Sequence, residues 1–167
     1  LFLEGRGDPR FGNEGGEYWQ NHKPVKQQRR AVGHAVRAAY LYAGMADVGV
    51  LTADTALIEA STRLWEDVVR SKLYLIGGIG STGDGEAFHG AYTLPNETAY
   101  NETCAAIALV MWSHRLFRIH GEARYIDVVE RALYNNVLAG VSLDGDRFFY
   151  PNPLASSGGY ERSAWFT

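Results

Sequence analysis

Apolar positions recur at helical spacing in four stretches of the chain, which group into two pairs. The first predicted helix runs from Val25 to about Val50, with Pro24 at a position that the first helical turn tolerates. Its apolar face consists of mostly small residues spaced three or four apart: Val32, Ala35, Val36, Ala39, Ala43 and Ala46. Such a face suits close packing against another helix. The second predicted helix runs from about Asp54 to Val69.

The second helix pair lies in the other half of the chain. One helix is predicted from about Glu102 to Ile119, and Gly121 is expected to end it, since glycine is common just after a helix. The next is predicted from about Ala123 to Leu138. Residues 141–150 then favour a short β-hairpin that turns at Asp144 and Gly145.

A glycine-rich stretch, residues 71–100, separates the two pairs and predicts a long loop, with short strands possible at Leu73–Ile76. Loops of this length in compact domains usually serve a function or are flexible. Helix pairs joined by such loops are typical of an α/α toroid, which four helices cannot close. A self-contained four-helix bundle is the structural alternative.

Composition narrows the range of partners. The net charge of −3 comes without a basic stripe, so no nucleic-acid partner is expected. Lys26, Arg29, Arg30 and Arg37 are interpreted as a solvated helix face. No uncharged apolar run is long enough for a bilayer, so no membrane association is expected. The single cysteine, Cys104, fits a reducing compartment, and we expect a cytoplasmic location.

Three acidic or thiol side chains are candidates for chemistry. Glu86 lies in the glycine-rich segment 83–88, where the backbone can approach a ligand and a carboxylate can serve as a general acid. Glu102 and Cys104, two residues apart at a helix start, could reach one ion, and both suit zinc. The plainer interpretations are a solvated loop glutamate and a small buried cysteine beside a first-turn glutamate.

Other candidates are weaker on sequence grounds alone. His34 could hydrogen-bond a ligand or simply pack within its helix, and Tyr150 could contact a sugar or be structural. Glu130 falls beside apolar positions, so we expect it to be buried and paired with an arginine, or to support a nearby site. Tryptophans could stack on a sugar or pack in the core: Trp19, Trp65 and Trp112.

Several motifs, taken in order, closely resemble glycoside hydrolase family 127, the β-L-arabinofuranosidases. The resemblance covers about residues 17–166. The motifs are HKPVK (22–26), GHAVRAAYLYAGMAD (33–47), GGIGS (77–81), GEAF (85–88), LPNETAYNETCAA (94–106), ERALYN (130–135) and SLDGDRFFY (142–150).

The resemblance implies a fold and an activity. The catalytic domain in this family is an (α/α)6 barrel followed by β-sandwich domains. We therefore expect an all-α dominated fold, a partial (α/α)6 barrel with a short β-hairpin and a long glycine-rich loop. Residues 1–167 would be a fragment of one such catalytic domain, incomplete at both ends. The implied activity is retaining hydrolysis that removes terminal β-L-arabinofuranose from an oligosaccharide or glycoconjugate, through a covalent intermediate.

The resemblance also implies roles for residues, with a cysteine thiolate as nucleophile on a zinc ion held by one glutamate and three cysteines. The implied roles are general acid/base for Glu86, zinc ligands for Glu102 and Cys104, substrate contacts for His34 and Tyr150, and support near the metal for Glu130. In the family, the pair matching Trp165 and Phe166 precedes the cysteines that complete the site. We therefore expect this polypeptide alone to be inactive and to bind zinc weakly.

Two other functions stay open at this point. A glycosidase of the same toroid type could use Glu86 and Glu102 as a carboxylate pair without metal. A non-catalytic carbohydrate-binding or scaffold domain is the other possibility.

Overall fold

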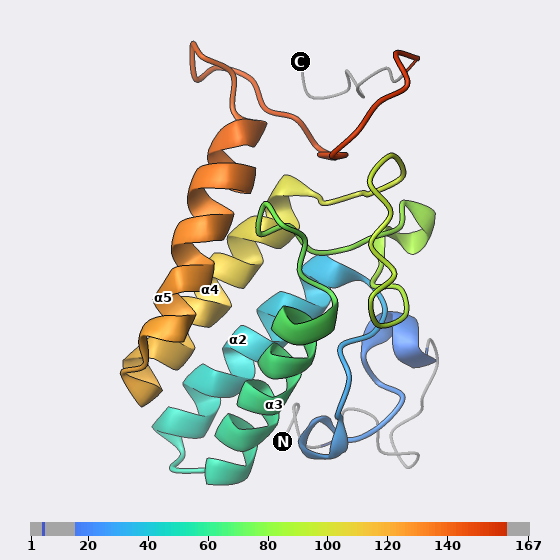
Figure 1. Ribbon diagram of the computed structural model, residues 1–167. Helices are drawn as coiled ribbons and strands as arrows, with labels where there is room; N and C mark the ends of the chain where they lie inside the picture. The colour runs from blue at the N-terminus through green and yellow to red at the C-terminus, as the bar shows by residue number, and fades with distance from the viewer. Residues whose placement is uncertain (1–4, 6–15, 160–167) are drawn as a thin grey trace.

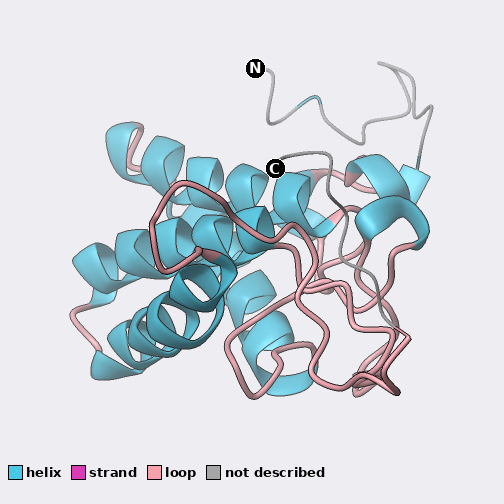
Figure 2. Cartoon of the chain, turned by 90° about the horizontal axis from the view of Figure 1, so that it is seen from above, coloured by secondary structure: helices cyan, strands magenta, loops and turns pink. Residues whose placement is uncertain are grey.

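The computed structural model describes residue 5 and residues 16–159, and helices are its regular elements (Figures 1 and 2). Within residues 16–159 the α-helices are α2 (Ala35–Leu51), α3 (Thr55–Ser71), α4 (Thr103–His120) and α5 (Ala123–Ala132). In space α2 packs against both α3 and α4, and α4 packs against α5. The two expected helix pairs are therefore confirmed, and the second pair packs on the first through α2 and α4. The expectations for Phe166 and its neighbours lie outside the described residues.

The predicted start of the first helix was wrong by ten residues. Val25–Gln27 form only a single 3-10 turn, η3, and α2 begins at Ala35. Between them, Gln28 is buried and Gly33 has a φ of +70°, a left-handed conformation that interrupts a helix. His34 then caps α2, since its side chain accepts a hydrogen bond from the backbone N–H of Arg37.

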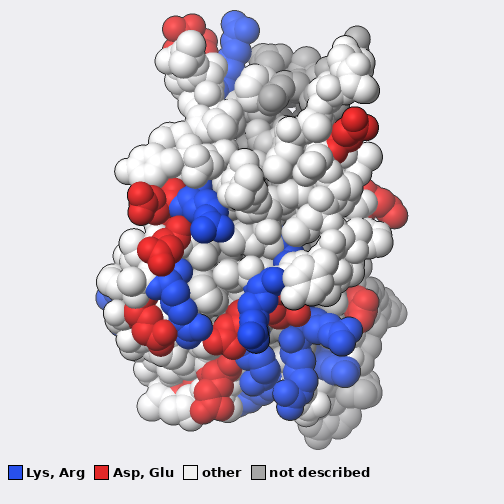
Figure 3. Space-filling view, viewed as in Figure 1, with Lys and Arg blue, Asp and Glu red and all other residues white. Residues whose placement is uncertain are grey.

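The basic residues around the start of α2 do not form the single solvated helix face that was expected. Arg29 and Arg30 are exposed, as expected. Lys26 instead pairs with Asp54 at 2.5 Å, and the Arg37 guanidinium lies over the Tyr18 and Trp19 rings. Figure 3 shows basic and acidic side chains interspersed on the left of the face it presents, and a group of basic side chains bordered by acidic ones at its lower part.

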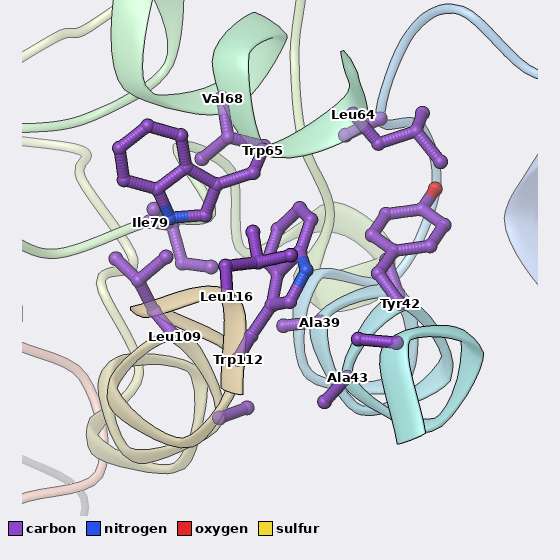
Figure 4. Close-up of a cluster of buried hydrophobic side chains, with 14 of the residues drawn as sticks. Ala39, Tyr42, Ala43, Leu64, Trp65, Val68, Ile79, Leu109, Trp112 and Leu116 are labelled. Carbon is purple, nitrogen blue, oxygen red and sulfur yellow. The ribbon is translucent and has the colours of Figure 1, made fainter. Parts of the chain in front are cut away.

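The core lies between α2, α3 and α4. The small-residue face of α2 is confirmed, with Ala35, Ala39, Ala43 and Ala46 buried. Figure 4 shows larger side chains filling the space between the helices, among them Trp65 and Trp112. Both tryptophans are at most 2% exposed, so they serve the core and are not available to a sugar. Within the described residues, no helix has the length and apolar character needed to span a bilayer.

The end of α5 departs from the predicted regular helix. After Ala132 the chain forms a π-helical turn, η5 (Leu133–Val137), and then a 3-10 turn, η6 (Leu138–Gly140). The wider π turn brings the Asn136 side chain fully into the interior.

The predicted β-structure is reduced to bridges. The turn of the expected hairpin is present, because the Gly145 N–H donates to the Ser142 carbonyl, but Val141 and Phe148 form only an isolated antiparallel bridge. The suggested strand at Leu73–Ile76 is a turn, in which Leu75 is 83% exposed. The long loop is confirmed, since only a single 3-10 turn, η4 (Asp84–Glu86), lies between α3 and α4.

Candidate active site

Three loop segments meet at the end of the helices where α2 and α4 begin (Figure 1). They are the residues just before α2, which end at the capping residue His34, the glycine-rich loop, and the segment after η6. Two side-chain bonds of Asn152 fasten the last segment to the start of α4: its amide donates to the Asn101 carbonyl and to Thr103 Oγ1, both at 3.0 Å. The Thr103 N–H also donates to the Tyr150 carbonyl at 3.0 Å. These bonds bring Tyr150 to the start of α4.

A tight turn presents Glu86. Gly85 and Glu86 both have left-handed backbone conformations, with φ of +64° and +52°. Thr82 and Ala87 close the turn by exchanging two backbone hydrogen bonds, of 3.1 and 3.3 Å. A Cβ atom at position 85 would lie 3.0 Å from Cε2 of Tyr18, so the turn needs glycine on two counts.

Three side chains hold the Glu86 carboxylate. His34 Nε2 lies 3.0 Å from Oε2, the Tyr100 hydroxyl donates to Oε1 at 2.8 Å, and the Tyr150 hydroxyl donates to Oε1 at 3.5 Å. The Glu86 side chain is nevertheless 31% exposed, so it is both oriented and reachable. Because His34 Nδ1 accepts the N–H of Arg37, the neutral imidazole carries its proton on Nε2 and donates it to Glu86.

Glu102 and Cys104 form a second, more deeply buried pair. Glu102 is 4% exposed, and its Oε2 has no hydrogen-bond partner among the described residues. Burial raises the pKa of the Glu102 carboxyl, although hydrogen bonds from Cys104 and Tyr150 oppose this. Burial, reinforced by the bond to Glu102, raises the pKa of the Cys104 thiol to about 12. The Tyr150 hydroxyl, with one proton to donate, lies within hydrogen-bond reach of both Glu86 and Glu102 and so links Glu86 to the Glu102–Cys104 pair.

The Glu102–Cys104 pair fits a thiophilic divalent cation. A carboxylate oxygen without a partner lies beside a thiol that burial keeps protonated, and a cation would compensate the first and lower the pKa of the second. Oxygen and thiolate are both good zinc ligands. Within the part of the chain that the structure describes, no group of three or more His, Cys, Asp and Glu side chains is arranged to hold a metal. Among the described residues, Glu102 and Cys104 are thus the two candidate ligands of this site.

The structure therefore brings five of the six predicted site residues into one cluster: Glu86, His34, Tyr150, Glu102 and Cys104. Glu130 differs. It lies exposed on α5, so its expected burial was wrong, and its support of a metal site stays a prediction.

Sequence reasoning missed Tyr100, which makes the shortest hydrogen bond to Glu86. Burial raises the pKa of its hydroxyl far above the ordinary range, and the bond to Glu86 adds to this, so Tyr100 stays a donor. The available signal was a tyrosine two residues before Glu102 in the segment 94–106. A separate groove of about 880 Å³ opens between α3 and the loop 88–92, and none of the clustered residues lines it.

Comparisons with known proteins all identify one enzyme family. Residues 4–167 match the family model described as β-L-arabinofuranosidase, GH127 catalytic domain. A non-reducing end β-L-arabinofuranosidase of Bifidobacterium longum subsp. longum is 43% identical over 140 residues, which are 84% of this chain and 21% of that protein.

Solved structures agree with the family model. A GH127 β-arabinofuranosidase superposes with a TM-score of 0.93 at 53% identity, over 99% of this chain and 26% of that one. A GH127 β-L-arabinofuranosidase from Geobacillus stearothermophilus T6 gives 0.84 at 44% identity, over 92% and 27% of the two chains. The chain thus spans about a quarter of these relatives' length. Its helix pairs are part of an (α/α)6 barrel, the fold of these enzymes, and the alternative of a separate four-helix bundle was wrong.

Proposed function

We propose that this chain, which belongs to the GH127 family of β-L-arabinofuranosidase catalytic domains, supplies the acid/base half of the active site to a retaining glycosidase. Its substrate would be a terminal β-L-arabinofuranosyl group on an oligosaccharide or glycoconjugate. The observation that carries the proposal is the fixed yet reachable Glu86 carboxylate, joined through Tyr150 to the buried Glu102 and Cys104.

Glu86 would serve as the general acid/base in two steps. First, its carboxyl gives a proton to the glycosidic oxygen as that oxygen leaves the anomeric carbon, while a nucleophile bonds to this carbon. Then the Glu86 carboxylate takes a proton from the water that attacks the anomeric carbon and frees the nucleophile. His34 and Tyr100 hold the carboxyl on both oxygens, so its direction is set before the substrate arrives.

His34 and Tyr150 are proposed to contact the sugar as well. Both side chains border Glu86, and His34 is 15% exposed. The imidazole and the phenol hydroxyl could exchange hydrogen bonds with sugar hydroxyls once the substrate displaces part of their bonding to Glu86.

Zinc is the proposed cofactor. Glu102 and Cys104 would hold it together with cysteines from outside residues 1–167, and one of those cysteines would be the nucleophile. A bound zinc ion would keep coordinating thiolates deprotonated at neutral pH. The buried Glu102 oxygen without a partner and the adjacent thiol support this assignment. A cytoplasmic location, and the lack of nucleic-acid and membrane partners, stay predictions.

The test is turnover of p-nitrophenyl β-L-arabinofuranoside by the full-length protein. Three arms accompany it: removal of zinc with a chelator, Glu86→Gln, and Glu97→Gln as a matched control on an exposed glutamate of the same loop. We expect turnover to fall at least about 100-fold with Glu86→Gln, the low end of what general acid/base catalysis contributes. Chelation should abolish it and zinc should restore it, whereas Glu97→Gln should behave as the unchanged protein.

Other outcomes identify the alternatives. Turnover that survives chelation but fails in Glu86→Gln and Glu102→Gln would indicate a metal-independent carboxylate pair. A folded, zinc-bearing protein without turnover on this glycoside would reject the arabinofuranoside, and other furanosides would be assayed next. Sugar binding without any hydrolysis would indicate a carbohydrate-binding module.

A further inference from the structure

Two neighbouring aromatic rings lie exposed beside the Glu86 cluster. Tyr18 is 39% exposed and Trp19 is 45% exposed, and their rings meet edge to face with centroids 5.2 Å apart. Among the described tryptophans, Trp19 is the one that reaches the surface, because Trp65 and Trp112 are in the core. Exposed aromatic rings that adjoin a polar cluster are typical of ligand sites, where they provide flat apolar area.

Tyr18 touches the residues on either side of the proposed acid/base. Its ring stands edge-on to the His34 imidazole, with centroids 6.2 Å apart. It also closes on the turn that carries Glu86, because a Cβ atom on Gly85 would lie 3.0 Å from Tyr18 Cε2. The phenol ring therefore forms a wall next to Glu86 on the His34 side.

The backbone around Tyr18 is held firmly, although the side chain is exposed. The buried Gln20 amide donates to the carbonyls of Tyr18 and Val32, at 2.9 and 3.0 Å, and the His34 N–H donates to the Tyr18 carbonyl at 3.3 Å. Gly33 allows the segment before α2 to lie against the backbone of Glu17 and Tyr18, since a Cβ at position 33 would lie 2.2 Å from the Glu17 carbonyl oxygen. Tyr18 is thus fixed to the residue that caps α2, His34.

Arg37 orients both rings from the helix. Its guanidinium carbon lies 4.4 Å from the Tyr18 ring centroid and 3.8 Å from that of Trp19. Cation–π contacts of this kind restrict ring motion, and here they place a positively charged donor group over the Tyr18 and Trp19 rings. A ligand with both an apolar face and hydroxyl groups, such as a sugar ring, matches this combination.

The order of contacts indicates which part of the substrate would lie here. Cys104 bonds Glu102, Tyr150 joins Glu102 to Glu86, and Glu86 pairs with His34, against which Tyr18 packs. The Glu102–Cys104 end of this series lies at the proposed zinc ion, which would hold the nucleophilic cysteine near the anomeric carbon, and the acid must face the leaving oxygen. The Tyr18 end then lies toward the group that departs with that oxygen.

We propose that Tyr18, extended by Trp19, forms the subsite for the leaving group, namely the sugar ring or aglycone to which the arabinofuranosyl group is attached. This inference rests on the proposed glycosidase function. An apolar C–H face of the leaving sugar would pack on the part of the Tyr18 ring that the guanidinium leaves exposed, and its hydroxyls would face the Arg37 guanidinium. Tyr18 would thereby discriminate between substrates by the group on the leaving side of the scissile bond.

The test compares two substrates of the full-length protein that share the arabinofuranosyl group. One is a β-L-arabinofuranosyl disaccharide, which fills the leaving-group subsite, and the other is methyl β-L-arabinofuranoside, which does not. We expect Tyr18→Ala to lower the ratio of kcat/KM between disaccharide and methyl glycoside about tenfold, equivalent to about 1.4 kcal/mol. Trp19→Ala should lower the same ratio, whereas Tyr18→Phe keeps the ring and should keep the ratio.

Controls separate this subsite from other roles. Tyr92→Ala changes a tyrosine that is 75% exposed in the loop 88–95 and should keep the ratio. An unchanged ratio in both Tyr18→Ala and Trp19→Ala would overturn the subsite, including the case where both substrates slow equally because Tyr18 only positions His34. If Tyr18→Ala does not fold, Tyr18→Leu, which keeps apolar bulk without a ring, replaces it. If the wild-type protein hydrolyses neither glycoside, the proposed glycosidase function itself is overturned.

Discussion

Two core tryptophans donate their indole N–H groups to serines on the facing helix. Trp112 Nε1 of α4 donates to Ser61 Oγ of α3 at 2.9 Å, and Trp65 Nε1 of α3 donates to Ser113 Oγ of α4 at 2.9 Å. The Ser61 hydroxyl in turn donates to the Tyr42 carbonyl of α2 at 2.8 Å. Ser61 and Ser113 are fully buried, and Figure 4 shows both indoles inside the core. Ser61 thus connects the three helices whose ends carry the site.

Ser61→Ala removes the hydrogen bonds of the Ser61 hydroxyl while keeping the packing of the core nearly unchanged. Alanine fills nearly the same volume as serine, so no cavity of note forms, and the main effect is a buried indole N–H without an acceptor. A buried donor without an acceptor costs roughly 1–3 kcal/mol. We take this range to include the loss of the hydrogen bond from Ser61 to the Tyr42 carbonyl. We expect the free energy of opening to fall by about 2 kcal/mol.

Native-state hydrogen exchange on the intact protein measures this quantity at the amides of α3 and α4. Ser156→Ala is the matched control, because Ser156 is exposed, and surface changes usually stay within about 0.5 kcal/mol. Ser113→Ala should resemble Ser61→Ala, since Ser113 plays the same part for Trp65. A loss below about 0.5 kcal/mol in Ser61→Ala would refute the reasoning, because the indole would then have found another acceptor.

Three further predictions rest on single contacts or single buried groups. Tyr100→Phe removes the 2.8 Å bond to Glu86 and should lower kcat about tenfold with little change in KM; an unchanged kcat in steady-state assays would contradict this. Gly33→Ala should lower stability by roughly 1–3 kcal/mol through overpacking, seen as a lower Tm, while Gly16→Ala, with open space around it, provides the comparison. Burial lowers the pKa of His22 below its ordinary value of 6.5, so the unfolded chain binds more protons below that pH, and stability falls as pH drops from 6.5 through the folded-state pKa. His22→Gln should therefore reduce the Tm difference between about pH 7.5 and about pH 5.5, and an equal difference in both proteins would reject the assignment.

The helix boundaries could be predicted well where a local sequence signal sets them, and poorly where contacts with distant residues set them. Gly121 ends α4 as expected, because a left-handed residue after a helix is a local property of glycine. The start of α2 depends instead on Ala31, whose N–H donates to Asp67 of α3, and on Gln28, which bonds the Lys23 carbonyl. The spacing of apolar residues carries no information about these hydrogen-bond partners, so the helix was predicted to begin too early, at Val25.

The same division holds for the site. The glycines around Glu86 signalled a turn that exposes a carboxylate, and Gly85 indeed has a left-handed backbone there. Tyr100 carried no such signal, because its approach to Glu86 depends on Asn101, which is buried in a left-handed conformation and donates its N–H to the Gly80 carbonyl. Glu130 was misjudged for the opposite reason, since neighbouring apolar positions suggested burial that α5 does not provide.

Burial distinguishes Glu86 from Glu102, which the metal-independent alternative treats as a carboxylate pair. A carboxylate that transfers protons to a sugar must reach it, and the Glu86 side chain is 31% exposed, whereas Glu102 is 4% exposed. Glu86 has donors on both oxygens, but Glu102 keeps one buried oxygen without a partner while burial raises the pKa of its carboxyl. An uncompensated buried carboxylate is costly unless a cation balances it. The difference therefore favours a ligand role for Glu102 beside Cys104 over a direct carboxylate pair with Glu86.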